Sequence, residues 1–207
     1  MLKIPIEPML LMSASKPFDS PDYAFELKFD GVRMLAYRAD GGAHLINRRL
    51  HERTRVYTEV AEELARLPDG VVLDGEIVAP GPDGRPDFYR ILKRDRVTGP
   101  PDRLLREIPA RFIAFDILYL NGEDVTARPF RERRGRLEAL LQKSNLKNAV
   151  LCDSFLECGE ALFRAAASEN LEGIVAKRLD GVYTPGARTD AWIKIKNPKY
   201  TRPGADK

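Results

Sequence analysis

Residues 25–33 read Phe25-Glu26-Leu27-Lys28-Phe29-Asp30-Gly31-Val32-Arg33. Side chains alternate between the two faces of a β-strand, so this pattern predicts one apolar face and one charged face. The aromatic and aliphatic residues point to the core, and the charged face carries Lys28 between Glu26 and Asp30. Gly31 predicts a turn that brings Arg33 back beside them. Such a strand suits either a salt-bridged surface lysine or a functional amine, and the other charged strands of the chain favour the second interpretation.

The remaining apolar patterns predict short strands, separated by Gly and Pro, and a few helices. The predicted strands cover residues 23–28, 32–37, 43–47, 71–78, 112–119, 150–153, 173–177 and 191–195. Helical spacing of apolar residues predicts helices around 56–67, 130–141 and 159–169, with a short one near 88–93. Strands outnumber helices and show no regular βαβ alternation, so the fold class is α+β with mainly antiparallel sheets. We expect one domain over residues 1–199, with 200–207 as its edge or the start of a linker.

Two of these strands carry pairs of charges on one face. In 71–78, Asp74 and Glu76 share a face among branched aliphatic residues. A buried carboxylate needs a partner, which could be a structural arginine, a ribose hydroxyl or a divalent cation. In 192–196, Lys194 and Lys196 share a face and repel each other unless an anion lies close to both. That pattern is typical of a basic edge strand, and it also suits a nucleotide phosphate.

Composition argues against several other classes of protein. The chain of 207 residues is 31% charged and holds no apolar run near the ~20 residues that a membrane span needs. Its first residues lack the apolar stretch of a secretory signal, so we expect a cytoplasmic protein without membrane association. Two cysteines and two histidines are too few for a disulfide framework, a zinc site or a histidine-based triad. The net charge is only +3, but the basic excess between Arg90 and Arg111 suits a solvated face or a phosphate backbone.

The segment Lys28–Arg33 resembles the Lys-x-Asp-Gly-x-Arg signature of the covalent nucleotidyltransferases, which are ATP-dependent DNA ligases, RNA ligases and mRNA capping enzymes. Five further segments resemble the other motifs of that superfamily in the same order: Arg48, Asp74-Gly75-Glu76, Phe115-Asp116-Ile117-Leu118-Tyr119-Leu120-Asn121-Gly122, Glu172-Gly173-Ile174-Val175-Ala176-Lys177 and Trp192-Ile193-Lys194-Ile195-Lys196. The wording of residues 115–122, with Pro129-Phe130-Arg131-Glu132-Arg133-Arg134 after it, is most similar to the adenylation domain of DNA ligases. Within these, the chain looks closest to the bacterial ligases of non-homologous end joining.

The resemblance implies the nucleotidyltransferase fold, an ATP-grasp-like α+β arrangement of mainly antiparallel sheets flanked by helices, with the nucleotide pocket between them. Two departures stand out. The second motif usually reads Ser/Thr-Arg-x-Gly, whereas this chain has Asn47-Arg48-Arg49-Leu50, so we expect a loop of different shape after Arg48. Family ligases also continue into an OB-fold domain that helps to expel pyrophosphate, and we expect no such domain within residues 1–207.

The resemblance also implies roles for individual residues. Lys28 is the expected nucleophile, which attacks the α-phosphate of ATP and becomes AMP-linked. An ordinary lysine with a pKa of about 10.4 is almost fully protonated at neutral pH, so we expect nearby cations and burial to favour the free amine. The expected nucleotide-binding residues are Glu26, Leu27, Arg33, Arg48, Glu76, Phe115, Lys177, Lys194 and Lys196. The expected ligands of Mg²⁺ or Mn²⁺ are Glu172 and Asp30.

Among the nucleotide-binding residues, the resemblance implies that Phe115 stacks on adenine, Glu76 holds the ribose and Arg48 contacts a ribose or phosphate oxygen. Lys177 and Lys194 would neutralise the α-phosphate. Regular alternation would place Glu172 and Lys177 on opposite faces of their strand, so we expect Glu172 at the mouth of the strand, in a bend before Gly173.

The expected activity is AMP transfer to the 5′-phosphate of nicked or broken double-stranded DNA, with an OB-fold domain or an end-joining protein as a partner in trans. Two alternatives remain open from the residues. One is an RNA ligase or a GTP-using capping enzyme of the same superfamily. The other is a non-catalytic nucleic-acid-binding module, which the set of motif lysines argues against. An NAD⁺-dependent ligase fits poorly, because zinc cysteines are missing.

Overall fold

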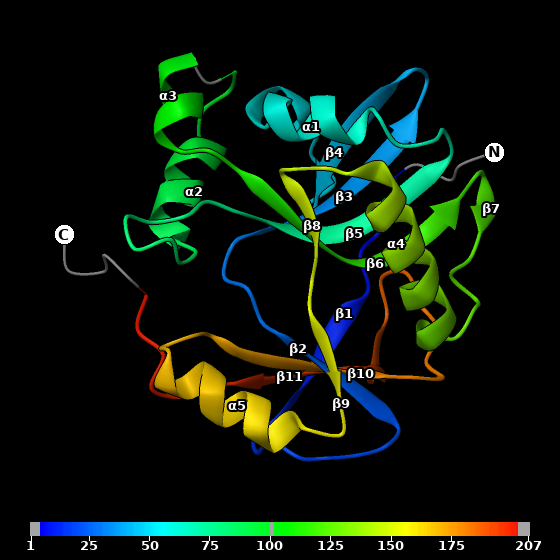
Figure 1. Ribbon diagram of the computed structural model, residues 1–207, viewed down its shortest axis with the longest axis vertical. Helices are drawn as coiled ribbons and strands as arrows, with labels where there is room; N and C mark the ends of the chain where they lie inside the picture. Colours follow the sequence, from blue (N-terminus) through cyan, green and yellow to red (C-terminus); the bar gives the residue numbers. More distant parts are fainter. Residues whose placement is uncertain (1–4, 100–101, 203–207) are drawn as a thin grey trace.

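The computed structural model describes residues 5–99 and 102–202, and these residues form two β-sheets (Figure 1). The five-stranded sheet has the order β1-β11-β10-β2-β9, and the six-stranded sheet has the order β4-β3-β5-β6-β7 with β8 beside β6. The strands of the first are β1 (Leu10–Ala14), β2 (Tyr23–Leu27), β9 (Ser154–Leu156), β10 (Gly173–Arg178) and β11 (Arg188–Lys196). Those of the second are β3 (Val32–Ala39), β4 (Gly42–Asn47), β5 (Val71–Val78), β6 (Arg111–Leu120), β7 (Glu123–Asp124) and β8 (Ala149–Leu151). The chain passes between the sheets directly after Lys28, so this segment lies where they meet.

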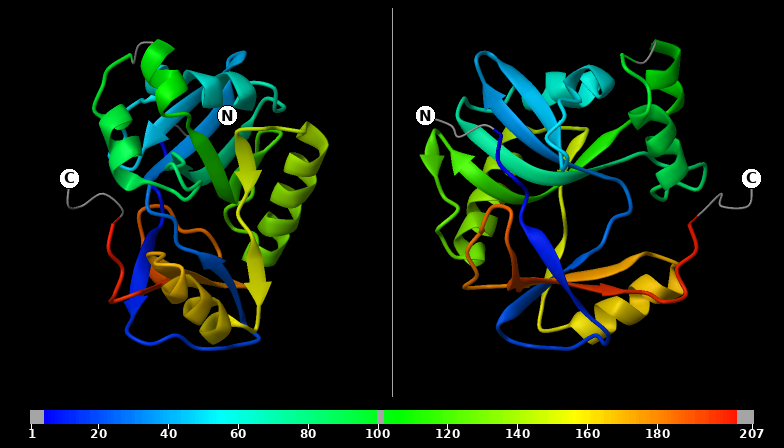
Figure 2. Two further views of the ribbon diagram at one scale, coloured as in Figure 1. Left: turned by 60° about the vertical axis from the view of Figure 1, so that its left-hand side comes forward. Right: turned by 180° about the vertical axis from the view of Figure 1, so that it is seen from behind.

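Helices cover the outer faces of the two sheets. They are α1 (Thr58–Leu64), α2 (Phe88–Asp95), α3 (Asp102–Glu107), α4 (Phe130–Ser144) and α5 (Gly159–Ser168), with a 3-10 turn at Thr54–Val56. In Figures 1 and 2, α5 lies against the five-stranded sheet, whereas α1, α2, α3 and α4 surround the six-stranded sheet. None of the helices in the described ranges is both long and apolar enough to cross a bilayer.

Strand β5 shows how the sequence divides the core. Val71, Leu73 and Ile77 are buried in the cluster beneath the helices, while Val72 faces the other sheet. The same alternation turns Asp74 and Glu76 toward the space between the sheets. Gly75 lies on the helix-facing side, where an added Cβ would come within 2.4 Å of the Phe112 ring. The strand is therefore apolar toward its helices and charged toward the second sheet.

The α+β class with mainly antiparallel pairing is confirmed, with two parallel exceptions, β1 with β11 and β6 with β8. The predicted strand 71–78 matches β5 at both ends. The predicted strand 23–28 is one residue longer than β2, which ends at Leu27. Residues 150–153 were predicted as one strand, but β8 ends at Leu151 and β9 begins at Ser154, so the chain moves there from one sheet to the other.

Several elements were not predicted. Strand β1 reads Leu-Leu-Met-Ser-Ala, which has no alternation to distinguish it from a loop, and its parallel pairing depends on a strand far along the chain. Helix α3 and strand β7 are six and two residues long, too short for a periodic pattern. Residues 200–202, expected at the domain edge, fold back onto Asp30, and 203–207 lie outside the described residues.

Candidate active site

A cavity lies between the two sheets, and charged and aromatic side chains line it. Seven residues singled out in the sequence border it: Glu26, Leu27, Lys28, Arg33, Glu76, Phe115 and Lys177. Leu11, Phe29 and Trp192 border it too. Trp192 lies on the same face of its strand as Lys194 and Lys196, so the sequence could have predicted that it borders the cavity. Leu11 gave no such signal, because its strand was not predicted.

Lys28 lies at one end of the cavity, directly after β2. Its backbone N–H donates to the Gly173 carbonyl at 2.9 Å, which extends the pairing of β2 with β10 by one bond. Its Nζ lies 2.6 Å from Oε2 of Glu172. Glu172 precedes β10 at a bend made by Gly173, whose φ of 136° favours glycine. The carboxylate thus stands at the mouth of its strand, as expected from the sequence, and faces the amine.

Two more lysines lie on β11, and one of them forms an ion pair with the same carboxylate. Lys196 Nζ lies 3.4 Å from Glu172 Oε1 and its side chain is 60% exposed. Lys194 lies opposite Val175 of β10 and forms no ion pair with any residue in the described part of the chain. Partial burial, followed by the charges of Lys196, Arg188 and Lys28, lowers the pKa of Lys194. A cation without a partner beside two others is electrostatically suited to an anion such as a phosphate.

A buried ion pair surrounded by aromatic rings also lines the cavity. Lys177 Nζ lies 2.7 Å from Glu26 Oε2 and donates to the Phe115 carbonyl at 2.7 Å. The same ammonium lies 4.5 Å from the ring centroids of Phe115 and Trp192 and 4.9 Å from that of Phe130. The register of β6 against β5 skips Phe115, so a bulge there turns the ring toward the cavity. Lys177 was expected at the α-phosphate, but its ammonium is committed to Glu26 and the rings.

Glu26 has one oxygen that nothing in the described chain satisfies. Its side chain is buried, and Oε1 accepts no hydrogen bond. Burial raises the pKa of Glu26, while Lys177 and then Arg134 lower it. A buried acceptor without a donor is costly, so it points to a ligand with a polar N–H group.

The partner of Asp74, left open by the sequence, is a structural arginine. Arg33 Nε and Nη2 donate to the two oxygens of Asp74 at 3.0 and 2.6 Å, and Nη1 donates to the Met9 carbonyl. Its guanidinium lies 5.3 Å from the Trp192 ring centroid and borders the cavity. Arg33 therefore lines the cavity with its side chain, which packs against the Trp192 ring, while its N–H groups bond to Asp74 and Met9.

Glu76 borders the cavity between Lys28 and Arg33. Burial raises its pKa to about 8, against the lowering effect of these two cations. Below that value Glu76 carries a proton in the folded protein, so it can both donate and accept hydrogen bonds, as a ribose hydroxyl requires.

This pKa makes stability depend on pH in a predictable direction. From its usual value of 4.5 up to about 8, folded Glu76 holds a proton that the unfolded chain releases, so stability falls as pH rises. Glu76→Gln does not titrate, so its stability relative to wild type should improve by about 3 kcal/mol between pH 5 and pH 8. Urea unfolding at both pH values measures this, with Glu62→Gln on an exposed position as control. An identical pH dependence of both variants would contradict the assignment.

Two expected site residues lie elsewhere. Arg48 is exposed and borders a separate hollow with Glu7, Leu10 and Gly186, so the structure does not bring it to the Lys28 cavity. The adjoining loop holds its turn without the usual glycine, because Leu50 itself adopts a φ of 63°. Asn47 Oδ1 also accepts from two backbone N–H groups of that loop.

Asp30 is likewise engaged by the protein instead of facing a metal site. Its oxygens accept from Arg202 Nε at 2.7 Å, Arg202 Nη2 at 3.1 Å and the Tyr200 hydroxyl at 2.9 Å. The arginine also lies 4.0 Å over the Phe88 ring of α2. In the described ranges no cluster of three His, Cys, Asp or Glu side chains could hold a metal ion. The expectation that Asp30 acts through a metal is therefore not supported by this arrangement.

Comparison with known proteins agrees with this geometry. The family model described as "ATP dependent DNA ligase domain" matches residues 8–196, nearly the whole chain. This chain belongs to that family. It is 36% identical over 202 residues to a DNA ligase of Thermococcus fumicolans, covering 93% of this chain and 36% of the relative. It is 32% identical over 196 residues to the SPbeta prophage-derived DNA ligase-like protein LigB of Bacillus subtilis, covering 95% and 69%.

The fold of this ligase domain agrees with a solved relative. A structure titled "mycobacterial DNA ligase D complexed with ATP and MES" superposes with a TM-score of 0.76 at 31% identity, covering 92% of this chain and 60% of that one. The chain thus spans about a third of the length of the Thermococcus relative and three fifths of the mycobacterial chain.

Proposed function

We propose that this chain is the adenylation unit of an ATP-dependent DNA ligase, with Lys28 as the residue that carries AMP. The observation that carries the proposal is the Lys28 amine held 2.6 Å from the buried Glu172 carboxylate, beside a cavity that aromatic rings also line. A surface lysine in a structural ion pair needs neither the cavity nor the neighbouring cations. The relatives' names support the choice of DNA ligase over RNA ligase or capping enzyme.

The first step forms one bond and breaks one. The lone pair of Lys28 Nζ attacks the α-phosphorus of ATP, and the bond from that phosphorus to the bridging oxygen breaks, so that pyrophosphate leaves with the electron pair. The amine loses a proton, and Glu172 Oε2 is the acceptor within hydrogen-bond distance. Lys194 and Lys196 stand where they would neutralise phosphate oxygens as charge builds up on the leaving group.

The aromatic end of the cavity suits the base. Phe115 and Trp192 offer ring surface, and Glu26 Oε1 is a free acceptor for the exocyclic amine of adenine. The protonated Glu76 carboxyl suits a ribose hydroxyl. In this orientation the nucleoside lies between Lys177 and Lys28, with its phosphates toward β11.

A divalent cation fits this donor set, because Mg²⁺ in phosphate sites takes one or two carboxylates together with phosphate oxygens. Glu172 would hold it and supply the protein ligand, with the nucleotide supplying others. The ion would polarise the α-phosphate and neutralise its charge.

The activity proposed for the whole protein is sealing of nicked or broken double-stranded DNA in repair, including end joining. After Lys28 is charged, AMP passes to a DNA 5′-phosphate and a 3′-hydroxyl then displaces it. An OB-fold domain or an end-joining protein is the proposed partner. The basic run 90–111 contributes less surface charge than its composition suggests, because Arg94 is fully buried against Glu59 and two carbonyls.

The test is intact-protein mass after incubation with ATP and Mg²⁺, followed by peptide mapping. The expected result is a gain of one AMP on the peptide that contains Lys28, with little or no gain from GTP. Labelling by GTP instead would favour a capping-type enzyme. No adduct with either nucleotide would overturn the proposal and favour a non-catalytic module.

Lys194→Ala should slow AMP attachment by about a hundredfold, the usual cost of losing one group that stabilises developing charge. The pKa of Lys194 is lowered by its cationic surroundings, so its removal relieves repulsion and should not destabilise the fold. Single-turnover labelling with ATP measures the rate, and Lys199→Ala on an exposed position is the control. An unchanged rate would remove Lys194 from the phosphate site.

A further inference from the structure

Arg134 of α4 reaches the buried carboxylate at the base end of the cavity. Its Nη1 lies 3.6 Å from Glu26 Oε1, too long for a hydrogen bond but close enough for strong attraction between charges. Both atoms are buried, and neither has a hydrogen-bond partner in the described chain. On the other side, Arg134 Nε donates to Glu138 Oε1 at 2.6 Å, one turn along the helix. The guanidinium is therefore held in place from behind.

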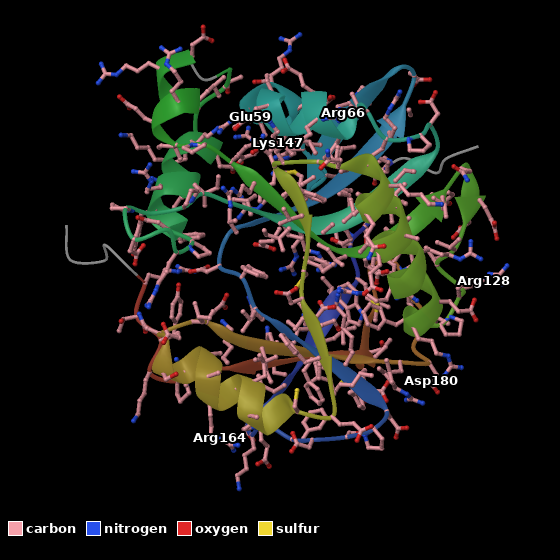
Figure 3. The ribbon with its side chains drawn as sticks, viewed as in Figure 1. Glu59, Arg66, Arg128, Lys147, Arg164 and Asp180 are labelled. Carbon is pink, nitrogen blue, oxygen red and sulfur yellow. The ribbon has the colours of Figure 1, made fainter. Side chains whose placement is uncertain are left out.

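The preceding residue, Arg133, is a structural arginine, and its contacts differ from those of Arg134. Arg133 donates to both oxygens of Asp116 and to the carbonyls of Arg128 and Gly181. Figure 3 labels Arg128 and Asp180 near the beginning of α4, where the loop before the helix and the loop after β10 meet it. Arg133 is satisfied by the protein, whereas Arg134 keeps a donor directed toward the cavity end.

Glu26 is surrounded by a small set of charged and titratable groups. They are Lys177 from β10, Arg134 from α4, Asp116 from β6 and the thiol of Cys152 between β8 and β9. The two cations favour its ionised form, and burial and the aspartate oppose it. Lys177 occupies Oε2 with a direct hydrogen bond, but Arg134 acts on Oε1 from 3.6 Å and leaves its lone pairs open.

We propose that Arg134 is a specificity-determining positioning residue, which holds Glu26 as an ionised acceptor for the amine of a 6-aminopurine. The inference rests on the proposed function and identifies Arg134 as a residue that maintains the selectivity of the site for adenine. An ionised carboxylate accepts from the 6-amine of adenine and repels the 6-oxygen of guanine or hypoxanthine. A protonated carboxyl would instead donate to that oxygen and weaken the discrimination. Without Arg134, Glu26 takes up a proton at higher pH.

The test compares ATP with ITP, in which an oxygen replaces the 6-amine and N1 carries a hydrogen, and with purine riboside triphosphate, which has no group at position 6. In Arg134→Met, the preference for ATP over ITP should fall about tenfold, the scale of one charge-assisted hydrogen bond, while purine riboside triphosphate is unaffected. As the pH is lowered, the rate of reaction with ATP should begin to fall at a higher pH in the variant than in wild type. Arg134→Lys should restore most of the preference. The matched control is Arg131→Met, which removes an exposed cation from the same helix.

A purely structural role would lower the rates with all three nucleotides equally, and an unchanged ATP-to-ITP preference in Arg134→Met would overturn the inference outright. Arg134→Gln, uncharged but polar, serves if the methionine variant does not fold. Equilibrium binding of ATP and ITP without divalent cation measures the same preference without the covalent step. Absence of AMP on Lys28 with a retained, Arg134-dependent preference would overturn the proposed function and leave this inference standing.

Discussion

Lys28→Arg should abolish AMP attachment, with a loss of more than about 10⁴-fold, while ATP binding persists. The guanidinium keeps a positive charge opposite Glu172, so the ion pair that now spans 2.6 Å can re-form and the fold is preserved. It provides no neutral nitrogen at working pH, because arginine stays protonated in proteins. Charge and binding are thus retained while nucleophilicity is removed.

Single-turnover labelling with α-labelled ATP gives the rate, and equilibrium binding of ATP shows that the cavity is intact. Lys16→Ala, at an exposed lysine outside the cavity, should label like wild type. Residual labelling of Lys28→Arg that maps to another lysine would place the nucleophile elsewhere. Loss of both labelling and binding would show that the variant damaged the cavity and would contradict the expected separation.

Strand periodicity accounts for the part of the site that the sequence predicted well. The rule of alternate faces places Asp74 and Glu76 toward the second sheet, and β5 ends where its apolar run ends. The same rule would put Glu172 and Lys177 on opposite faces, so the family resemblance, which implies that both belong to the site, predicted Glu172 at the bend before Gly173. Neither prediction needed knowledge of the partner strands.

The contacts that the sequence did not predict join side chains that are distant in sequence. Asp30 was expected at a metal, but Arg202 and Tyr200, 170 or more residues later, fold back to bind it. Arg33 was expected on the nucleotide, and its donors are taken by Asp74, across the pairing of β3 with β5. Arg134 was missed because an arginine at helical spacing is most often solvated. No local pattern shows which of several long cations will find a buried carboxylate.

Arg133→Met should destabilise the protein by about 3–5 kcal/mol, the largest effect on stability expected here. Arg133 and Asp116 are both fully buried and joined by two hydrogen bonds of 2.8 Å. The methionine leaves the aspartate charge buried without its main partner, which costs more than the lost pair itself contributed. Because Arg133 also binds the Gly181 carbonyl after β10, its loss loosens the contact of α4 with the five-stranded sheet.

Urea unfolding of four proteins tests this as a double-mutant cycle: wild type, Arg133→Met, Asp116→Asn and the double variant. If the pair is coupled as its geometry indicates, the double variant loses less stability than the sum of the single changes, because neither partner is left as an unpaired charge. Arg131→Met, exposed on the same helix, should stay within about 0.5 kcal/mol of wild type. Additive losses would mean that Arg133 stabilises the fold through its bonds to the Arg128 and Gly181 carbonyls alone. The position of Arg134 would then be fixed by the bonds of α4 to the loops at residues 128 and 181, and not by the ion pair of Arg133 with Asp116 of β6.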